Sequence, residues 1–576
     1  MLETAGVAVT PALLEGWRTR IGRARRHLKW TGVAAVARTH ATGTSLALEA
    51  PCDVLFLATE VNEWAWCSTL LENAPDRIPA LEAALLAQAL EDAADPALVV
   101  PARLEEGAAF ERFDALEARE ARPLLRALIE ASVARALPYT LDEELLTLGS
   151  GHRSENFPVV ALPAVGQVDW ARLGDVPTAI VTGSNGKTTS VRLLAACARA
   201  TGLKAAFNCT DGVFLDGEAL AAGDYSGPAG ARRVLREPRA EAAILETARG
   251  GILRRGIAAS RANVALVTNV SADHFGEYGI DDLEGLADVK LSVAGLVDPR
   301  GLVVLNADDP VLAARAAGLS ARFGRTLKLG WFALDDEHPT LVRHRGAGGA
   351  TAGVANGRVT LSFDGRASDL GAVEALPLTV GGSARYNVAN LLGAALAAAA
   401  LGVPSATIAA VFARFGATRS DNPGRMMRFE AGGVVILIDY AHNPDGLKGL
   451  LEVARHLGHG RGRLGVLLGH AGNRQDADLV AVARVVAGFH PDLVVVKEDE
   501  AHLRGRDIGE VPQIIRAALL AAGLPEAAVP LAGNELRAVD AALAWARPGD
   551  VLALPVHSAT ARAAVLARLE GMSAGA

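Results

Sequence analysis

The sequence predicts an α/β protein of three domains: an N-terminal α+β domain over residues 1–165, a central α/β domain with a mostly parallel sheet over 166–420, and a C-terminal Rossmann-like α/β domain over 421–576. Three observations support this prediction. The chain has 576 residues, more than one hydrophobic core usually supports. From Val176 onward, short apolar runs alternate with helix-like segments. Leu145 to Trp170 is rich in Gly, Pro and polar residues and predicts a linker before that alternation.

Composition and charge argue against several classes of function. The formal net charge is −8, so the chain lacks the basic excess that nucleic acid or an anionic membrane attracts. Runs of about 18 uncharged apolar residues do not occur, which excludes a membrane span. The first thirty residues carry acids early and arginines late, the reverse of a secretory signal. We therefore expect a soluble cytoplasmic protein with a small-molecule role and no nucleic acid or membrane partner.

The four cysteines have no metal-binding spacing, since none falls in a CxxC pair. Together with the expected cytoplasmic location, this predicts buried thiols in a reducing compartment. They are Cys52, Cys67, Cys197 and Cys209.

The N-terminal domain combines strand and helix signals. Residues 30–40 (WTGVAAVARTH) and 44–50 (TSLALEA) alternate as strands do, whereas Pro79 to Leu90 and Arg119 to Ala136 have helical apolar spacing. No group of residues there suggests catalysis.

The central domain alternates strands with helices, as parallel βαβ units do. The runs AAILET, VALVTNV and GLVVLNAD each end in polar residues. A β-rich insertion from Thr326 to Leu378 precedes the helix RYNVANLLGAALAAAALG. The last domain repeats the alternation with VVILIDYAHN, RLGVLLGHAGN, PDLVVVKEDE and GDVLALPVH. In such sheets the carboxyl ends of the strands form the binding edge.

A glycine-rich turn follows the first strand of the central domain and predicts a P-loop that binds the phosphates of a nucleotide. Its glycines let backbone N–H groups surround an anion, and the next helix adds its positive N-terminal end. Lys187 would neutralise the β and γ phosphates, and the Thr188 hydroxyl would bind Mg²⁺. Val181 replaces the first glycine of the usual pattern, so this turn is shorter. The predicted nucleotide-binding residues of the turn are Gly183, Ser184, Asn185, Gly186, Lys187, Thr188 and Thr189.

Acidic and imidazole side chains follow two further strands. AAILET supplies Glu246, and VALVTNVSADHFG supplies Asp273 and His274. If these strands neighbour the P-loop strand, Glu246 and His274 point at the phosphates and form a magnesium site. Taken singly, the glutamate could cap a helix and the histidine could be structural.

Seven motifs in fixed order resemble the Mur ligase family. They are TGSNGKTT, ETARGGILR, NVSADHFG, DVKLSVAG followed by VVLNADDP, RYNVANLLGA, NPGRM and IDYAHNPDG, and the resemblance extends from about Val176 to the C-terminus. The family includes peptidoglycan amino-acid ligases, folylpolyglutamate synthase and the C-terminal ligase module of cyanophycin synthetase. NCTDGVFLDGEAL, GDYSGPAGARRVL and KEDEAHLRGRDIGE are similar to the last of these. Cyanophycin synthetases also carry an ATP-grasp domain before that module, which the roughly 165 residues preceding the P-loop leave no room for.

The resemblance implies an ATP-dependent ligase that uses Mg²⁺. ATP converts a carboxylate to an acyl phosphate, an amine attacks it, and phosphate leaves to give an amide. Lys187 would hold the β and γ phosphates, Thr188 and Glu246 would bind one Mg²⁺, and His274 a second. Lys290 matches the family lysine that CO₂ carbamylates, and the carbamate would support a metal. A lysine on the helix surface is the alternative.

Further site residues follow from the same resemblance. Asn390 matches a position near the adenine base, and Asn387 shares its helix face, unless the pair is a cap and a core amide. Arg425 and Asp439 match residues that contact ATP when the domains close, with Arg425 at the γ-phosphate. His442 would line the cleft. Arg425 could instead form only a structural salt bridge.

The segment LVVVKEDEAHLRGRDIGE lies where family members bind the incoming amine. Its charges could pair with an amino-acid zwitterion, and its acidic lining would suit arginine, the amine that the cyanophycin module adds. A solvated loop is the alternative. The candidate residues are Lys497, Glu498, Asp499, Arg504 and Arg506.

Partners and competing functions remain open at this stage. The resemblance implies an amino acid and a small-molecule or peptide acceptor, with a homo-oligomer or a separate ATP-grasp partner possible. Trp64 and Trp66 could form an acceptor surface or belong to the core. A catalytically silent nucleotide-binding partner and a peptidoglycan-type amino-acid ligase are the alternatives. A P-loop kinase would not explain NPGRM and DYAHNP.

Overall fold

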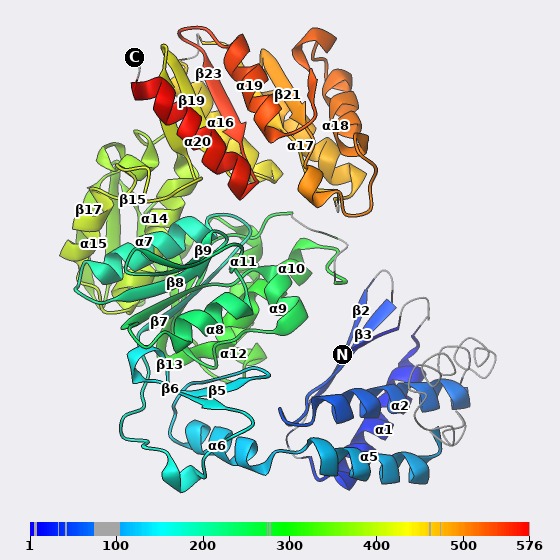
Figure 1. Cartoon of the computed structure of the whole chain (residues 1–576). Helices are drawn as coiled ribbons and strands as arrows, with labels where there is room; N and C mark the ends of the chain where they lie inside the picture. Colours follow the sequence, from blue (N-terminus) through cyan, green and yellow to red (C-terminus); the bar gives the residue numbers. More distant parts are fainter. Residues whose placement is uncertain are drawn as a thin grey trace. The chain divides into compact units, whose positions relative to one another are not determined.

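The fold is that of a computed structural model, shown in Figure 1. It describes residues 1–4, 9–73 and 104–574, except 31, 33, 41, 42, 273, 274, 276, 277, 460, 461 and 473, with only the backbone of 501 and 572–574. The chain forms two compact units. The first comprises Met1–Leu148, Asn156–Leu173 and Phe275–Asp282, and the second comprises Gly149–Glu155, Gly174–His274 and Leu283–Ala576. The bounds of the three predicted domains stay predictions.

The first unit combines helices with a small antiparallel sheet of order β1-β3-β2. Both strands predicted for residues 30–50 are confirmed as β2 and β3. Trp64 and Trp66 belong to the core, each only 5% exposed. The elements are β1 (Leu2–Glu3), α1 (Pro11–His27), β2 (Ala35–His40), β3 (Gly43–Leu48), α2 (Leu55–Asn73), α5 (Glu106–Glu120) and α6 (Pro123–Ala134).

One prediction for this region is wrong and one stays a prediction. The single helix expected over Arg119 to Ala136 is two helices, because α5 ends at Glu120 and Pro123 starts α6 at a position where its missing N–H costs nothing. The linker expected from Leu145 to Trp170 stays a prediction, and its leucines and Trp170 pack in a core with α6. It contributes to the sheet of β4 (Tyr139–Leu141), β5 (Leu145–Leu148) and β6 (Glu155–Pro158). The helix predicted from Pro79 to Leu90 lies outside the described residues.

The second unit contains an eleven-stranded sheet of order β10-β9-β8-β11-β7-β12-β13-β14-β15-β16-β17. Strands β8 to β15 in that order pair in parallel, and antiparallel pairs occupy both margins. The predicted insertion therefore extends the same sheet. The strands are β7 (Thr178–Thr182), β8 (Ala205–Cys209), β9 (Gly212–Leu215), β10 (Glu218–Ala222), β11 (Ala242–Glu246), β12 (Ala262–Val267), β13 (Val297–Asn306), β14 (Leu329–Phe332), β15 (Ala350–Ala355), β16 (Arg358–Phe363) and β17 (Arg366–Ala372).

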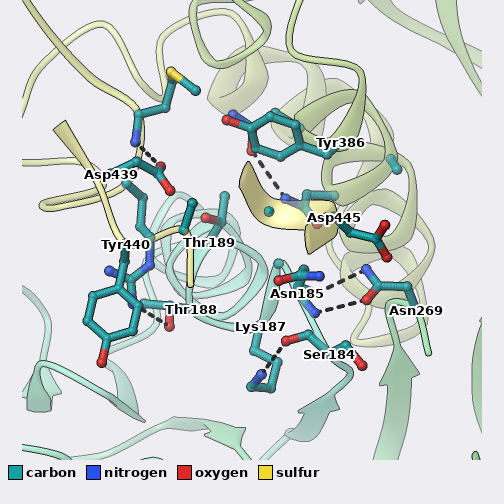
Figure 2. Close-up of a pocket in the computed structure, with 18 of the residues that line it drawn as sticks. Ser184, Asn185, Lys187, Thr188, Thr189, Asn269, Tyr386, Asp439, Tyr440 and Asp445 are labelled. Carbon is teal, nitrogen blue, oxygen red and sulfur yellow. Dashed lines mark hydrogen bonds between the residues drawn. The ribbon is translucent and has the colours of Figure 1, made fainter. Parts of the chain in front are cut away.

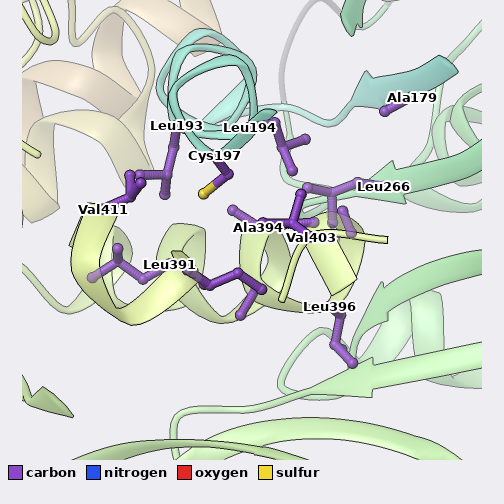
Figure 3. Packing of buried hydrophobic residues seen from close by; sticks show 14 of the residues in the cluster. Ala179, Leu193, Leu194, Cys197, Leu266, Leu391, Ala394, Leu396, Val403 and Val411 are labelled. Carbon is purple, nitrogen blue, oxygen red and sulfur yellow. The ribbon is translucent and has the colours of Figure 1, made fainter. Parts of the chain in front are cut away.

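Helix α7, which follows the P-loop, packs in a hydrophobic core. Figure 3 shows Leu193, Leu194 and Cys197 of α7 facing Leu391 and Ala394 of α14. The alanines of α14 let the two backbones approach closely, so the helix behind the P-loop is firmly supported. The helices around this sheet are α7 (Lys187–Arg199), α8 (Pro228–Arg236), α9 (Arg249–Arg255), α10 (Leu283–Leu291), α11 (Pro310–Ala316), α12 (Leu319–Arg322), α13 (Pro339–Gly346), α14 (Arg385–Ala400) and α15 (Ser405–Phe412).

The C-terminal part of this unit forms a second sheet, of order β18-β19-β23-β20-β21-β22. Only β18 runs antiparallel to its neighbour, and apolar clusters cover both faces, so the Rossmann-like prediction is confirmed. Its elements are β18 (Met427–Ala431), β19 (Val434–Asp439), α16 (Pro444–Leu457), β20 (Leu464–Leu468), α17 (Asp476–Gly488), β21 (Leu493–Lys497), α18 (Glu510–Ala521), β22 (Leu531–Ala532), α19 (Glu535–Trp545), β23 (Val551–Pro555) and α20 (Ala559–Ala574).

All four cysteines are free thiols, as expected. Cys67, Cys197 and Cys209 are buried, and burial raises the pKa of each to about 12, whereas Cys52 is half-buried. Within the described part of the chain, every helix is too short or too polar to cross a membrane.

Candidate nucleotide site

The glycine turn adopts a backbone that only glycine accepts at two positions. Gly183 has φ +149°, and a Cβ there would lie 1.9 Å from the Thr268 hydroxyl oxygen. Gly186, the N-cap of α7, has φ +84°, and its Cβ would lie 2.1 Å from Asn390 Oδ1. A side chain at either position would displace the loop. The turn is therefore shaped by its contacts with the next strand end and with α14.

Replacing Gly186 by Ala is expected to weaken nucleotide binding at least about tenfold, because the methyl group would displace Asn390 and strain the loop. Gly202 offers a matched control: its φ is +91°, but a Cβ there meets nothing within 4 Å. Gly202→Ala should lower the melting temperature without changing the affinity. Titration with a non-hydrolysable ATP analogue measures both variants. Equal affinities would show that the Gly186 backbone does not shape the site.

Lys187 lies over the loop that precedes it. Its Nζ donates hydrogen bonds to the carbonyl oxygens of Gly183 and Ser184, at 3.0 and 2.9 Å (Figure 2). The ammonium group thus stays beside the backbone N–H groups at the start of α7. Positive charge and donors are concentrated at one point, as an anion requires.

Glu246 ends β11 directly beside the P-loop strand, because β11 and β7 pair in parallel. Its Oε2 accepts a hydrogen bond from Thr188 Oγ1 at 2.9 Å. The side chain is fully buried, and Oε1 has no hydrogen-bond partner within the described structure. Burial raises the pKa of Glu246, while Lys187, Thr188 and Arg425 oppose the rise. A buried, partly unsatisfied carboxylate next to a hydroxyl fits a divalent cation, so the residues present fit the predicted Mg²⁺.

Arg425 contributes a second positive charge from the segment that follows α15. Its Nη2 donates to Thr210 Oγ1 at 2.9 Å and lies 3.5 Å from Thr188 Oγ1. The guanidinium stacks 4.4 Å from the centroid of the Tyr440 ring. Arg425 therefore stands at the same threonine that contacts Glu246.

Two asparagines from the C-terminal sheet region also contact the P-loop. Asn443 Nδ2 donates to Asn185 Oδ1 at 2.9 Å, and Asn422 Nδ2 donates to Thr189 Oγ1 at 3.1 Å. These hydrogen bonds join residues more than 230 positions apart. The far part of the second unit thus closes over the loop.

Asp439 acts on the backbone next to Arg425. Its Oδ2 accepts a hydrogen bond from the Met426 N–H at 2.7 Å, and Met426 has the unusual φ of +49°. Burial raises the pKa of Asp439, and Arg425 opposes the rise. His442 Nδ1 lies 3.0 Å from the Tyr440 carbonyl oxygen.

A cavity of about 320 Å³ joins these residues (Figure 2). Of the predicted site residues, it is lined by Ser184, Asn185, Gly186, Lys187, Thr188, Thr189, Glu246, Asn387, Asn390, Arg425, Asp439 and His442. Sequence reasoning missed other lining residues, including Thr210, Asn269, Asn306, Tyr386, Tyr440 and Asp445. Thr210 and Tyr440 directly follow sheet strands and Asn306 ends one, and this position is a signal that could have identified them.

Three predicted residues are not in that lining. Gly183 lies below the loop surface against Thr268. Lys290 is buried in the last turn of α10, 3% exposed. His274 lies outside the described residues, and among the residues that are described, none form a cluster of three or more His, Cys, Asp or Glu suited to a metal. Carbamylation of Lys290 and a second metal therefore stay predictions.

The predicted amine-binding loop uses several of its charges internally. Lys497 is fully buried, pairs with Glu535 and donates to the Pro555 carbonyl at 2.7 Å. It therefore cannot pair with a substrate zwitterion, and this prediction is wrong. Arg506 donates to Asp476 and Glu510 at 2.7 and 2.6 Å.

Sequence comparison matches two family models to the second unit. Residues 181–398 match the Mur ligase middle domain. Residues 424–554 match the Mur ligase glutamate ligase domain. The first match contains the P-loop and Glu246, and the second contains Arg425 and Asp439.

Similar curated proteins include two cyanophycin synthetases. The protein of Synechocystis sp. is 38% identical over 368 residues, which are 64% of this chain and 41% of that protein. The protein of Nostoc sp. is 36% identical over 399 residues, 69% of this chain and 43% of that protein. The match thus spans about two fifths of the length of these relatives.

A more distant curated protein and a solved structure are also similar to this chain. The UDP-N-acetylmuramoyl-L-alanyl-D-glutamate–2,6-diaminopimelate ligase of Xanthomonas oryzae is 29% identical over 387 residues, 65% of this chain and 70% of that protein. Among solved structures, Mycobacterium tuberculosis folylpolyglutamate synthase complexed with ADP aligns with a TM-score of 0.49 and 19% identity, covering 68% of this chain and 90% of that one.

Proposed function

Since the chain belongs to the Mur ligase family, whose domain models match residues 181–398 and 424–554, we propose that it is an ATP-dependent ligase that couples a carboxylate to an amino-acid amine and forms an amide. The observation that supports this most is the convergence of Lys187, Thr188, Glu246 and Arg425 on one cavity. Two positive side chains beside a buried carboxylate and hydroxyl form a site for a metal-bound triphosphate.

Each residue has a role in binding ATP. The backbone N–H groups at the start of α7 bind the phosphates, and Lys187 neutralises the β and γ positions. Thr188 Oγ1 and Glu246 Oε1 would hold Mg²⁺, which supplies further positive charge at the terminal phosphates. By the family resemblance Asn390 would lie near the base, and Asn387 is on the same helix. Asp439, which the family resemblance implies contacts ATP, also holds the backbone beside Arg425 by accepting a hydrogen bond from the Met426 N–H.

The proposed reaction is the one that the resemblance to the family implies. A carboxylate oxygen of the acceptor attacks the γ-phosphorus, the bond to ADP breaks, and an acyl phosphate forms. The amine then attacks the acyl carbon, phosphate leaves, and the amine proton passes to a base. Arg425 and Lys187 stabilise the charge on the transferred group throughout.

We propose arginine as the first amine to test, in chemistry like that of the cyanophycin synthetases. The similarity to proteins of that name at 36 to 38% identity supports this choice. A peptidoglycan-type amino-acid ligase is the second candidate, supported by the 29% identical diaminopimelate ligase. The acceptor is a small molecule or peptide, and a homo-oligomer or a separate ATP-grasp partner remains a proposal.

A substrate screen tests this function. Phosphate release from ATP is measured for pairs of acceptors and amino acids, acyl phosphate is trapped with hydroxylamine, and products are identified by mass. We expect release that depends on one acceptor and one amine, and a product equal to their sum less one water. Equal release with every amino acid would remove the arginine assignment. A phosphorylated acceptor as the final product would indicate a kinase, and nucleotide binding without turnover a silent partner.

A further inference from the structure

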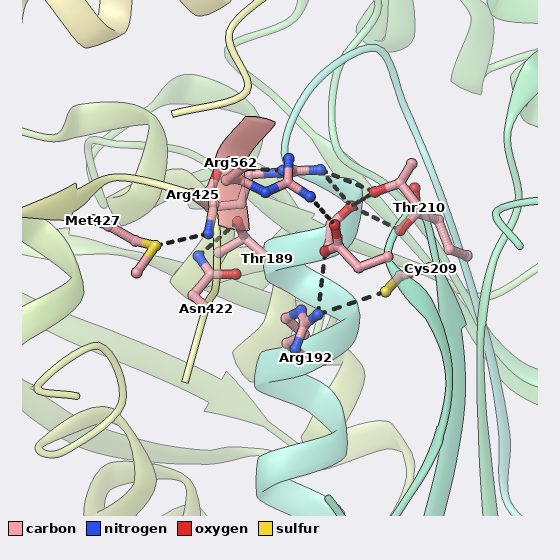
Figure 4. A network of polar contacts seen from close by, with 12 residues as sticks. Thr189, Arg192, Cys209, Thr210, Asn422, Arg425, Met427 and Arg562 are labelled. Carbon is pink, nitrogen blue, oxygen red and sulfur yellow. Dashed lines mark hydrogen bonds and ion pairs between the residues drawn. The ribbon is translucent and has the colours of Figure 1, made fainter. Parts of the chain in front are cut away.

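Helix α20 carries a second arginine that contacts the same loop as Arg425. Arg562 Nη2 donates to Asp211 Oδ1 at 2.8 Å, while Arg425 Nη2 donates to the neighbouring Thr210 at 2.9 Å. Both acceptors follow β8 directly. Two arginines from the C-terminal part of the second unit thus contact two successive residues of one loop (Figure 4).

Asp211 is fixed to the helix that carries Lys187. Arg192, on α7, donates from Nη2 to Asp211 Oδ2 at 3.2 Å and lies within 5.6 Å of the Phe207 and Phe214 ring centroids. The side chains of Arg192, Asp211 and Arg562 are 9%, 14% and 11% exposed. Water therefore screens these ion pairs weakly. Arg562 is therefore paired with a residue that is held against α7, the helix that begins at the P-loop.

Arg562 also packs against the backbone from which Arg425 projects. Gly424 has φ +70°, and a Cβ there would lie 2.8 Å from Arg562 Cδ. The Gly424 carbonyl accepts a hydrogen bond from Arg425 Nη1 at 3.2 Å. The Tyr440 ring lies 4.4 Å from one guanidinium and 5.8 Å from the other. Arg425 and Arg562 therefore both contact Gly424 and the Tyr440 ring.

Hydrogen bonds fix the segment immediately before α20. Glu535 accepts hydrogen bonds from the N–H groups of His557 and Ser558, at 2.7 and 2.9 Å, just before the helix begins. Its carboxylate pairs with the buried Lys497. The ion pair between Lys497 and Glu535 therefore also helps to hold the start of α20, the helix that carries Arg562.

We propose that Arg562 is a positioning residue: its ion pair with Asp211 and its packing on Gly424 hold Arg425 at Thr188 and Thr210. This inference rests on the proposed function, in which Arg425 neutralises the γ-phosphate. The P-loop binds the nucleotide through other groups. Losing Arg562 should therefore lower kcat and leave the KM for ATP nearly unchanged, since a small displacement of a catalytic group costs rate rather than binding.

The test compares Arg562→Met with Arg568→Met in the full chain. Arg568 is on the same helix, but its pair with Asp540 is surface-exposed, so it controls for lost charge. We expect kcat to fall about 30- to 100-fold in the first variant, with KM for ATP within about threefold, and no change in the second. Arg562→Lys should recover part of the loss. Hydrogen–deuterium exchange of segments 208–213 and 422–427 should rise only in Arg562→Met.

A double variant decides whether Asp211 is the partner. If Arg562 acts through Asp211, the double variant Arg562→Met/Asp211→Asn should have a kcat no lower than that of the worse single variant. If the two single losses in kcat multiply in the double variant, Asp211 is not the partner. Unchanged exchange at both segments, or equal kcat in the Arg562 and Arg568 variants, overturns the positioning role. If the unaltered protein binds a Mg²⁺–ATP analogue but turns over no substrate, the proposed function fails, and the exchange measurement alone decides the role of Arg562.

Discussion

Replacing Lys187 by Met is expected to lower ATP turnover by about 10²- to 10³-fold, because the variant lacks the ammonium that neutralises the transferring phosphate. Methionine keeps much of the side-chain length, so the loop loses only the hydrogen bonds to Gly183 and Ser184. Stability should change by roughly 1 kcal/mol. Phosphate release under saturating substrates measures the effect. Lys204, exposed one residue before β8, supplies the control, since Lys204→Met should retain full turnover. Full turnover in Lys187→Met would remove the phosphate role.

Replacing Glu246 by Gln is expected to lower turnover by a similar factor while stabilising the nucleotide-free protein. Burial raises the pKa of this carboxyl in the folded state. A raised pKa means that its contribution to stability is present below the unfolded pKa, about 4.3, and is lost as pH rises through the folded pKa. At neutral pH the buried charge therefore costs stability, and the amide removes that cost. The apparent melting temperature should rise by about 2 °C at pH 8, with the difference shrinking toward pH 4.

Glu237 gives a control of opposite sign for that experiment. Its hydrogen bond with Arg239 lowers its pKa, so its contribution to stability is present above the unfolded pKa and is lost as pH falls through the folded one. Glu237→Gln should lower the melting temperature at pH 8 and leave turnover unchanged. A lower melting temperature in Glu246→Gln at pH 8 would contradict the role assigned to burial.

Local pattern was sufficient for much of the site. The sequence places Lys187 and Thr188 after an apolar strand, and Glu246 at the end of another, and the parallel pairing of β7 and β11 brings them together. Thr210 was accessible to the same reasoning, since it follows β8. The helix predicted over Arg119 to Ala136 failed because one proline outweighed the apolar periodicity on both sides of it.

Contacts between distant segments could not be read from local pattern. Asn443 meets Asn185, and Arg562 meets Asp211, across 258 and 351 positions. Arg425 was found through family resemblance, not through spacing. Lys497 was misassigned because a charge at a strand end looks the same in sequence whether it faces a substrate or a buried carboxylate such as Glu535.

The most direct test of the central claim is the Mg²⁺ dependence of ATP-analogue binding, measured by titration calorimetry in the unaltered protein and in Glu246→Gln. If Thr188 and Glu246 hold the metal beside the phosphates, Mg²⁺ should tighten binding at least about tenfold in the unaltered protein. In the variant, that gain should disappear, and metal-free binding should not weaken, because the amide removes a negative charge beside the phosphates. An equal gain in both proteins would show that the metal binds elsewhere and would contradict the account of the site.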